Sequence, residues 1–154
     1  MADVLPSPAT GSIIDGVHYY AVRAFYEDTD LSGIVYHANY LRWFERARSD
    51  LLDRIGVDQR AAMEAGEGVY SVADLSIRYR APARLSDTVM LETRVKRIGK
   101  ASCELNQRAM RDDTLLAEMD VRVGFVSPDG RPRRQPDAWL AAFKTVTPTL
   151  QTES

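Results

Sequence analysis

The hydrophobic period of this chain changes once, and that change limits the folds it can adopt. Over residues 37–55 apolar side chains recur every three or four positions, and Gly56 follows as a C-terminal stop. The apolar positions of this stretch include Tyr40, Phe44, Ala47, Leu51 and Ile55. From Val69 onward the period becomes two. The sequence therefore predicts one long helix followed by strands.

The strands are predicted from alternation of apolar and polar side chains. Four stretches after the helix alternate in this way, over residues 69–80, 89–96, 101–109 and 115–125. One apolar and one charged face per strand is the pattern of an antiparallel sheet that is covered on one side. A fifth strand, over residues 17–27, precedes the helix and is rich in Tyr, Val and Phe.

Helix and strands each offer a single apolar face, so the economical fold is α+β. A curved five-stranded antiparallel sheet would wrap around the one long helix. We expect one domain over residues 17–143, closed by a short helix at its end. Residues 1–16 and 144–154 lack periodicity and are expected to be disordered tails. The outer face and edges of the sheet favour a homodimer or homotetramer, with the active site completed by a second copy.

Composition excludes several classes of function. The 154 residues are 45% apolar and 27% charged, with a net charge of −2, so nothing draws the whole chain to nucleic acid or anionic lipid. The cluster of Arg131, Arg133 and Arg134 has no aromatic platform beside it, and we expect no nucleic-acid partner. A leader and a membrane span are not expected, and the lone Cys103 fits a buried thiol in a reducing compartment. The predicted location is cytoplasmic.

Residues 25–48 hold the densest chemistry of the chain. Two acids, a glycine turn and a histidine lie together at the start of the predicted helix. A carboxylate there can act as nucleophile or base, while the unpaired N–H groups of the helix start can bind an oxyanion. The opening D-x-D-x-S-G also matches a calcium loop, but Asn39 stands where the closing Glu should be, so no metal is expected.

The acids of this segment are not equivalent. One of Asp28 and Asp30 should cap the turn, and Asp30 is the better catalytic candidate because it lies nearer Gly33 and the helix. A carboxylate near a helix start stays ionised, which suits a nucleophile and weakens a base. Glu45, in the helix, is the second-choice acid, although an ion pair with Arg42 or Arg48, or contact with solvent, is its ordinary role. His18 lies in a strand pattern and is expected to be structural.

Two runs of sequence resemble a known family. Residues 26–48 read Y-E-D-T-D-L-S-G-I-V-Y-H-A-N-Y-L-R-W-F-E-R-A-R, and residues 79–87 read Y-R-A-P-A-R-L-S-D. On these runs the chain resembles the hotdog-fold acyl-CoA thioesterases of the 4-hydroxybenzoyl-CoA thioesterase type, in the branch associated with the Tol-Pal system. The resemblance covers residues 17–143 in order. It implies a hotdog fold, dimers or tetramers, and hydrolysis of acyl-CoA without a metal or redox cofactor.

The resemblance also implies roles for particular residues. The second acid of the family's D-x-D motif would be the catalytic carboxylate, and it corresponds to Asp30. The Tyr-His pair of this branch, called the Y-H pair below, corresponds to Tyr36 and His37. The N–H of His37 would bind the thioester oxygen, with its imidazole as a positioning or acid/base group. The substrate-binding candidates are Gly99, Lys100 and Ser102, in a turn expected near the nucleotide of CoA, and Arg84, a strand-end cation that could meet a phosphate.

Two other functions are compatible with the same sequence. A noncatalytic hotdog scaffold could bind acyl-carrier or envelope-related proteins and would release no thiol. A hotdog dehydratase acting on carrier-bound acyl chains would use a His and a helix acid and would form an enoyl product. The sequence leaves open whether the acyl group is aromatic or aliphatic, how long it is, and whether CoA or acyl-carrier protein carries it.

Overall fold

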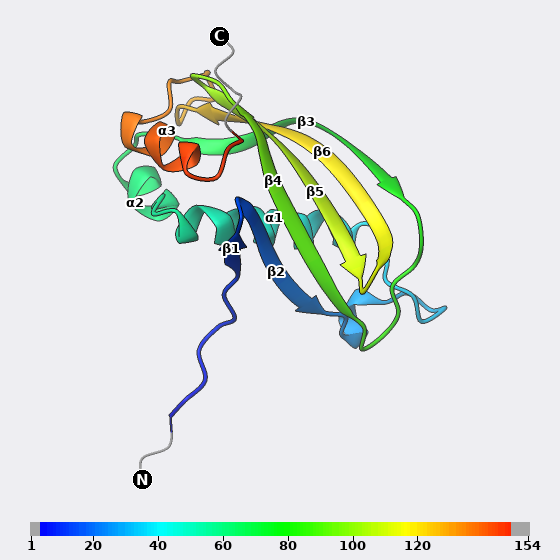
Figure 1. Cartoon of the computed structure of the whole chain (residues 1–154). Helices are drawn as coiled ribbons and strands as arrows, with labels where there is room; N and C mark the ends of the chain where they lie inside the picture. Colours follow the sequence, from blue (N-terminus) through cyan, green and yellow to red (C-terminus); the bar gives the residue numbers. More distant parts are fainter. Residues whose placement is uncertain (1–3, 149–154) are drawn as a thin grey trace.

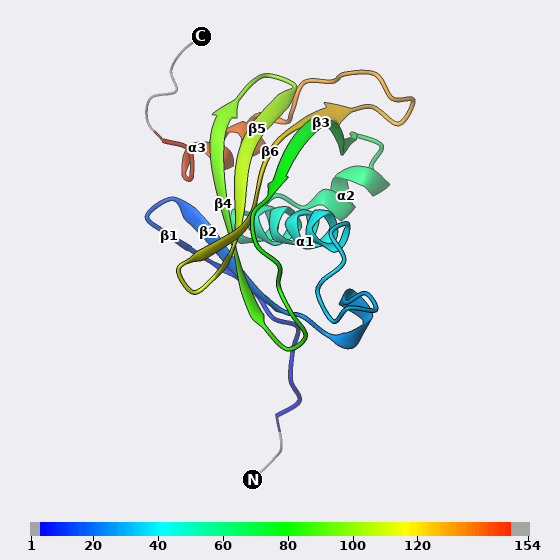
Figure 2. The ribbon, with the colours of Figure 1, turned by 90° about the vertical axis from the view of Figure 1, so that its right-hand side faces the viewer.

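The computed structural model describes residues 4–148, which form one curved sheet around one long helix (Figures 1 and 2). In chain order the elements are β1 (Ser12–Ile14), β2 (Val17–Arg23), the short 3-10 helix η1 (Tyr26–Asp28), α1 (Asn39–Arg54), α2 (Gln59–Glu64), β3 (Val69–Tyr79), β4 (Thr88–Ile98), β5 (Ser102–Arg111), β6 (Thr114–Val126) and α3 (Asp137–Lys144). The strands pair in the order β1-β2-β4-β5-β6-β3, and every pair is antiparallel. The α+β architecture expected from the change of period is confirmed.

α1 fills the concave side of the sheet, as its 3.6-residue period predicts. Its buried side chains belong to one continuous core with the inward residues of β4, β5 and β6. The buried apolar residues of α1 are Tyr40, Trp43, Phe44, Ala47, Leu51 and Leu52. The helix ends at Arg54, and Gly56 follows with a φ of 87°, in the left-handed region that glycine adopts at helix ends.

The sheet has six strands, and the prediction of five was wrong because β1 lies in the expected N-terminal tail. The Gly11 N–H donates to Asp50 Oδ2 over 2.9 Å, and a Cβ at Gly11 would lie 2.4 Å from the Tyr19 carbonyl oxygen. Tertiary contact therefore orders a segment that has no period of its own. At the other end Val146 is buried in the core, so the expected tail over residues 144–154 is also too long. Residues 1–3 and 149–154 lie outside the described chain.

The edge strand β3 contains a bulge that the period-two reading missed. Its pairing with β6 shifts register between Val72 and Asp74. Tyr70 and Val72 therefore pair with the buried β6 residues Phe125 and Val123, and they share the inward face with Leu75. Unbroken alternation over residues 69–80 predicts one shared face for Val69, Ser71, Ala73 and Leu75, and the register shift makes this wrong for the first three. A bulge inserts one residue into the strand, so each side chain before it points to the opposite face of the sheet from the one that simple alternation predicts.

A buried amide fixes α1 against the sheet. Gln107 on β5 is fully buried, and its Nε2 donates to the Phe44 carbonyl oxygen over 2.9 Å and to Thr93 Oγ1 over 3.0 Å. Its Oε1 accepts from Arg48 Nη1 over 2.9 Å. Because each polar atom of this buried amide is satisfied, the network favours one rotation of α1 over others.

His18 is structural, as expected, and forms a buried pair with an acid of α1. Its Nε2 lies 2.7 Å from Asp50 Oδ2, while its Nδ1 is buried without a hydrogen-bond partner in the described chain. Burial lowers the pKa of His18 from its ordinary value of 6.5, and the hydrogen bond to Asp50 opposes this only in part. The folded protein therefore holds His18 neutral at a pH where the unfolded chain protonates it.

The buried His18 should make stability depend on pH. Because its pKa is lower in the folded state, the unfolded chain binds more protons below pH 6.5, and the free energy of unfolding should fall as the pH drops below that value. Each unit of pKa difference is worth about 1.4 kcal/mol. Urea unfolding between about pH 8 and pH 5 measures this. His18→Gln, which can still donate to Asp50, should flatten the dependence, and an equally steep dependence in that variant would assign it to another group.

Candidate active site

The segment before α1 is a tight hairpin that lies at one end of the sheet. Thr29 and Val35 form an isolated bridge, and the Asp30 N–H donates to the Ile34 carbonyl oxygen over 2.9 Å. The Gly33 N–H donates to the Asp30 carbonyl oxygen over 3.1 Å, and Gly33 has a φ of 83°. Glycine adopts this left-handed backbone without strain, so Gly33 closes the turn and leaves Asp30 near its tip.

Asp28 makes its hydrogen bonds within this hairpin and to the start of α1, through one carboxylate oxygen and its carbonyl. Its Oδ2 accepts from the Phe25 N–H over 2.8 Å. Its carbonyl oxygen accepts from the Tyr36 N–H over 2.9 Å and from Asn39 Nδ2 over 2.8 Å. Asp28 is therefore the acid that caps the turn, and it also joins the hairpin to the first residue of α1.

Asp30 has one bonded and one free carboxylate oxygen. Oδ1 accepts from the Ser32 N–H over 2.8 Å and from Ser32 Oγ over 2.5 Å. Within the described chain Oδ2 has no hydrogen-bond partner, and the residue is exposed. The Ser32 hydroxyl, and after it the Ser32 N–H, lower the pKa of Asp30 below its usual value. The carboxylate is consequently ionised at neutral pH, with an oxygen available to a substrate.

The start of α1 leaves two consecutive N–H groups free. Asn39 N–H donates to the Tyr36 carbonyl oxygen over 2.9 Å, and the next two N–H groups donate to the carbonyls of residues 37 and 38. The N–H groups of His37 and Ala38 have no acceptor among the described residues. Adjacent unpaired donors at a helix start suit an oxyanion. The Asp30 N–H bonds the Ile34 carbonyl oxygen, and only residues 35 and 36 separate Ile34 from His37 in the chain.

The side chains of Tyr36 and His37 are exposed beside these donors. Their rings lie 4.6 Å apart, and the His37 ring meets that of Tyr79 edge-on at 5.8 Å. In residues 4–148 neither the His37 imidazole nor the Tyr36 hydroxyl makes a hydrogen bond. The backbone of this Y-H pair is thus fixed, while its side chains face solvent.

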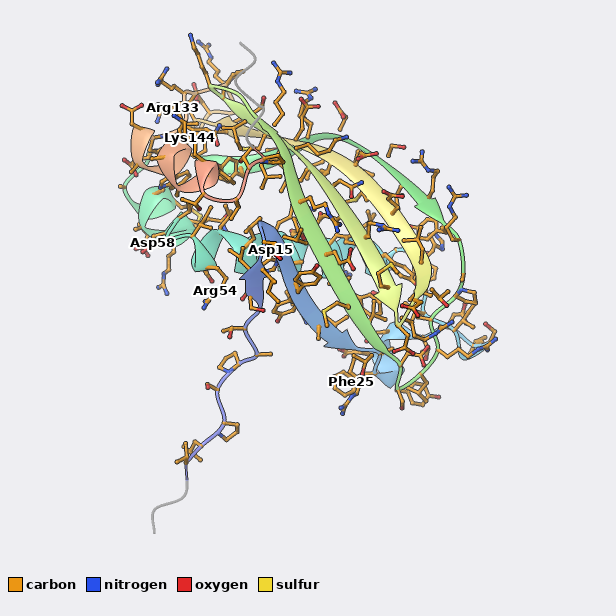
Figure 3. The ribbon with its side chains drawn as sticks, in the orientation of Figure 1. Asp15, Phe25, Arg54, Asp58, Arg133 and Lys144 are labelled. Carbon is orange, nitrogen blue, oxygen red and sulfur yellow. The ribbon has the colours of Figure 1, made fainter. Side chains whose placement is uncertain are left out.

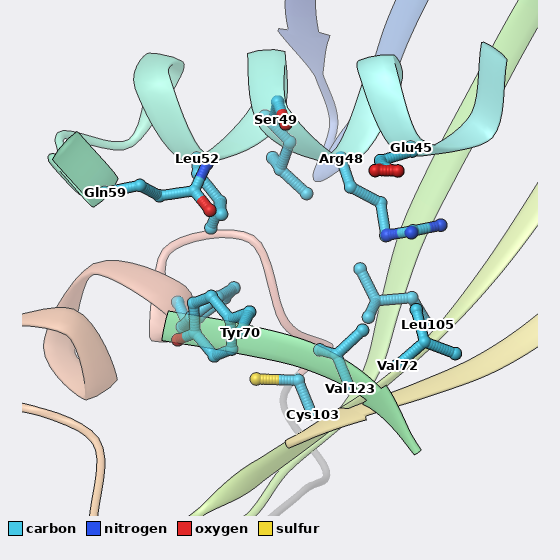
Figure 4. A pocket seen from close by; sticks show the side chains of 12 residues that line it. Glu45, Arg48, Ser49, Leu52, Gln59, Tyr70, Val72, Cys103, Leu105 and Val123 are labelled. Atoms are coloured by element: carbon cyan, nitrogen blue, oxygen red, sulfur yellow. The ribbon is translucent and has the colours of Figure 1, made fainter. Parts of the chain in front are cut away.

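A cavity of about 230 Å³ lies between the second half of α1 and the sheet (Figure 4). Its lining is mostly apolar, and includes Leu52, Val72, Leu105, Val123 and Phe143. Glu45 and Arg48 lie at one end in Figure 4, and Gln59 and Tyr70 at the other. Glu45 is exposed, and no ion pair joins it to Arg42 or Arg48 within 4 Å in the described chain, so of the two ordinary roles expected for it the structure shows contact with solvent.

The buried thiol of this cavity is not a nucleophile. Cys103 is 1% exposed, and burial raises its pKa to about 12. Its Sγ donates to Gln135 Oε1 over 3.3 Å, an oxygen that also accepts from the Tyr70 hydroxyl. The expected assignment of Cys103 as a core thiol is confirmed, and the amide of Gln135 fastens the segment before α3 to the sheet.

The predicted substrate-binding residues fall at opposite ends of the sheet. Arg84 lies beside the hairpin, since it bridges to Ile34, and the next N–H, that of Leu85, donates to Gly33. The turn with Gly99, Lys100 and Ser102 follows the other end of β4, about 33 Å of strand away. Figure 3 shows this separation, with Phe25 at the hairpin end and Arg133 and Lys144 at the far end. Within one chain the turn does not contact Asp30.

Three contributors to the site were missed in the sequence. Ser32 bonds the Asp30 carboxylate, Asn39 holds the hairpin, and the Tyr79 hydroxyl donates to the His37 carbonyl oxygen over 2.9 Å. The contact of Ser32 could have been predicted, because Asp followed two residues later by Ser often forms a turn in which the Asp side chain bonds the backbone. Tyr79 had none, because it lies 42 residues from its partner.

Comparison with known proteins identifies the family. The family model described as the thioesterase-like superfamily matches residues 26–144. The chain is 38% identical over 114 residues to the acyl-CoA thioesterase YbgC of Haemophilus influenzae, covering 74% of this chain and 84% of that protein. It is also 38% identical over 127 residues to the acyl-CoA thioester hydrolase YbgC of Escherichia coli O6:H1, covering 81% and 94%.

The solved structures agree with this likeness. A probable thioesterase from Bartonella henselae superposes with a TM-score of 0.72 at 31% identity, covering 78% of this chain and 98% of that one. The chain with its hotdog fold therefore belongs to the thioesterase-like superfamily.

Proposed function

We propose that this protein hydrolyses acyl-CoA thioesters to CoA and a free carboxylic acid. The observation that carries the proposal is an ionised carboxylate, Asp30, in the hairpin that leads directly to two free N–H groups at the start of α1. A nucleophile or base and an oxyanion site are what acyl transfer requires. The two YbgC relatives, named as an acyl-CoA thioesterase and an acyl-CoA thioester hydrolase, support the same reaction.

The mechanism assigns one task to each group. The free oxygen of Asp30 attacks the thioester carbonyl carbon while the N–H groups of His37 and Ala38 bind the carbonyl oxygen. The C–S bond then breaks, CoA leaves as a thiolate that takes a proton from solvent or His37, and a mixed anhydride remains. Water hydrolyses the anhydride and restores the carboxylate. In the alternative, Asp30 takes a proton from the attacking water; its lowered pKa favours the nucleophile. Neither route uses a metal or redox cofactor.

The apolar cavity is proposed to hold the acyl group, but it lies far from Asp30 of the same chain. α1 and β3 run in opposite directions: Tyr79, the last residue of β3, bonds His37, whereas Tyr70 near its start lines the cavity with Leu52. From His37 to Leu52 the chain advances about 22 Å along the helix. Within one chain, the Asp30 carboxylate therefore lies far from the cavity proposed for the acyl group.

A second copy of the chain would bring the two together. β3 is an edge strand, and α1 does not cover its apolar side chains: Val72, Leu75 and Tyr79 are 45%, 40% and 43% exposed. An unpaired, apolar edge favours pairing with another strand. Antiparallel pairing of two β3 strands about a two-fold axis places the start of one strand, with its cavity, beside the end of the other, with its hairpin. We propose this homodimer as the smallest active unit, and pairs of dimers as the homotetramer.

The dimer can be tested with a charge on β3. Leu75→Glu should convert the wild-type dimer or tetramer into a monomer, because a buried, unpaired carboxylate in each chain opposes association, and activity should fall with it. Size-exclusion chromatography with light scattering measures the mass. Met63→Glu, at an exposed apolar position of α2, is the matched control and should keep the wild-type mass. A Leu75→Glu protein with the wild-type mass would remove β3 from the interface.

The reaction is tested with purified protein, a panel of aliphatic and aromatic acyl-CoAs and acyl-carrier-protein thioesters, and a thiol-reactive dye. The expected result is thiol release with at least one substrate. A noncatalytic scaffold would give no release with any, and a dehydratase would give the absorbance of an enoyl product instead. Either outcome would overturn the proposal.

We also propose where the protein acts and what it contacts. A cytoplasmic location is supported by the free, buried thiol of Cys103. In residues 4–148, no helix has the length and hydropathy to cross a bilayer. Contact of Lys100 with CoA, an acyl-carrier partner and an association with the Tol-Pal system stay predictions from the sequence.

A further inference from the structure

Tyr79 is the one described side chain that bonds the backbone of the Y-H pair from another element. Its hydroxyl donates to the His37 carbonyl oxygen over 2.9 Å. The same oxygen accepts from the Tyr40 N–H over a longer 3.3 Å. β3 therefore supplies the shorter of the two bonds that hold the peptide between His37 and Ala38.

The ring that carries this hydroxyl is 43% exposed, and on its covered side it contacts the core ring of Tyr40. Tyr79 ends β3 and pairs with Ala117 of β6, and its ring meets that of Tyr40 edge-on at 5.6 Å. Tyr40 is 3% exposed, and its hydroxyl accepts from the Ala83 N–H over 3.3 Å. The sheet and the core of α1 thus fix the direction from which the hydroxyl approaches.

The bond acts on one of the two free donors. No described peptide bond is cis, so the His37 carbonyl and the Ala38 N–H point in opposite directions from one rigid plane. Holding the carbonyl fixes where the N–H points. A hydrogen bond accepted by the carbonyl also polarises the peptide and strengthens its N–H as a donor. Tyr79 can therefore set both the direction and the strength of a donor that it does not touch.

We propose that Tyr79 is a positioning residue of the oxyanion site, acting through the peptide between His37 and Ala38. This inference rests on the proposed function. The oxygen gains negative charge only as the thioester is attacked, so a better-aimed donor stabilises the transition state more than the bound substrate. The hydroxyl of Tyr79 should then affect kcat and leave KM nearly unchanged.

Tyr79→Phe removes the hydroxyl and keeps both ring contacts. With the best acyl-CoA of the panel, kcat should fall roughly 5- to 10-fold, the scale of one neutral hydrogen bond, while KM stays within about twofold. In amide NMR spectra of the full chain, the Ala38 proton should move upfield as its peptide loses polarisation. Tyr19→Phe is the matched control, because within residues 4–148 the Tyr19 hydroxyl makes no hydrogen bond. This variant should change neither kcat nor the chemical shift of the Ala38 amide proton.

The outcomes separate this inference from the proposed function. If the wild type releases thiol and Tyr79→Phe keeps its kcat within twofold, the positioning role is wrong and the thioesterase assignment stands. If kcat/KM falls only because KM rises, Tyr79 is a binding residue, and this result would also overturn the inference. If the wild type hydrolyses no thioester, both proposals fall together.

Discussion

Asp30→Asn is expected to lose roughly 100-fold or more in turnover, the usual scale for a catalytic acid or base. Asparagine keeps the oxygen that accepts from Ser32, so the hairpin should persist, but it carries no charge and is a poor nucleophile. The residue is exposed, and its side-chain hydrogen bonds go to Ser32 in the same turn. Steady-state thiol release measures kcat, and circular dichroism with thermal unfolding shows that the fold is intact.

Asp28→Asn is the matched control two residues away. Its carboxylate accepts from the Phe25 N–H, and an amide oxygen can do the same, so we expect near-normal kcat with a small loss of stability. Equal losses of kcat in the two variants would assign the effect to the hairpin rather than to the Asp30 carboxylate. An active Asp30→Asn protein would remove Asp30 from the mechanism.

Ala38→Pro should have the second largest effect, about 100- to 1,000-fold in kcat, because it deletes one of the two oxyanion donors. The φ of Ala38 is −68°, a value that proline adopts, and its N–H is not used by the fold. Helix formation should therefore survive the substitution. The measurement is kcat with the same acyl-CoA, together with the helical signal in circular dichroism.

Ala38→Ser keeps the N–H and is a favoured residue at a helix start, so it should retain nearly full activity. Proline also restricts the residue before it, here His37. A loss in the proline variant that is matched by loss of helical signal would reflect this restriction. Full activity of a well-folded Ala38→Pro protein would exclude the Ala38 N–H from the oxyanion site.

Most of the fold follows from local pattern, and the exceptions have physical causes. The long helix and the four later strands were predictable because their periods are dictated by one buried face. β1 was not, since Gly11 is ordered by contact with Asp50 of α1 and not by any repeat nearby. The bulge in β3 could not be predicted, because the residues on either side of it alternate as in a regular strand and the pattern does not show where the register shifts.

The site was predictable in its chemistry but not in its fine geometry. Asp30, Gly33 and the helix start follow one another in the chain, so local turn rules bring them together. Tyr79 comes from another strand, and only the folded sheet shows that its hydroxyl meets His37. Conversely, Lys100 reads well as a CoA contact in sequence, yet β4 carries it to the opposite end of the molecule from the hairpin.

Whether Asp30 is the centre of a thioester hydrolase is decided by product analysis of a single acyl-CoA turned over by the wild-type protein, with Asp30→Asn beside it. We expect free CoA and free carboxylic acid in equal amounts, no enoyl product, and a rate at least about 100 times that of the variant. No release of CoA above the rate of the variant, with any member of the panel, would contradict the assignment of this site as a thioesterase centre.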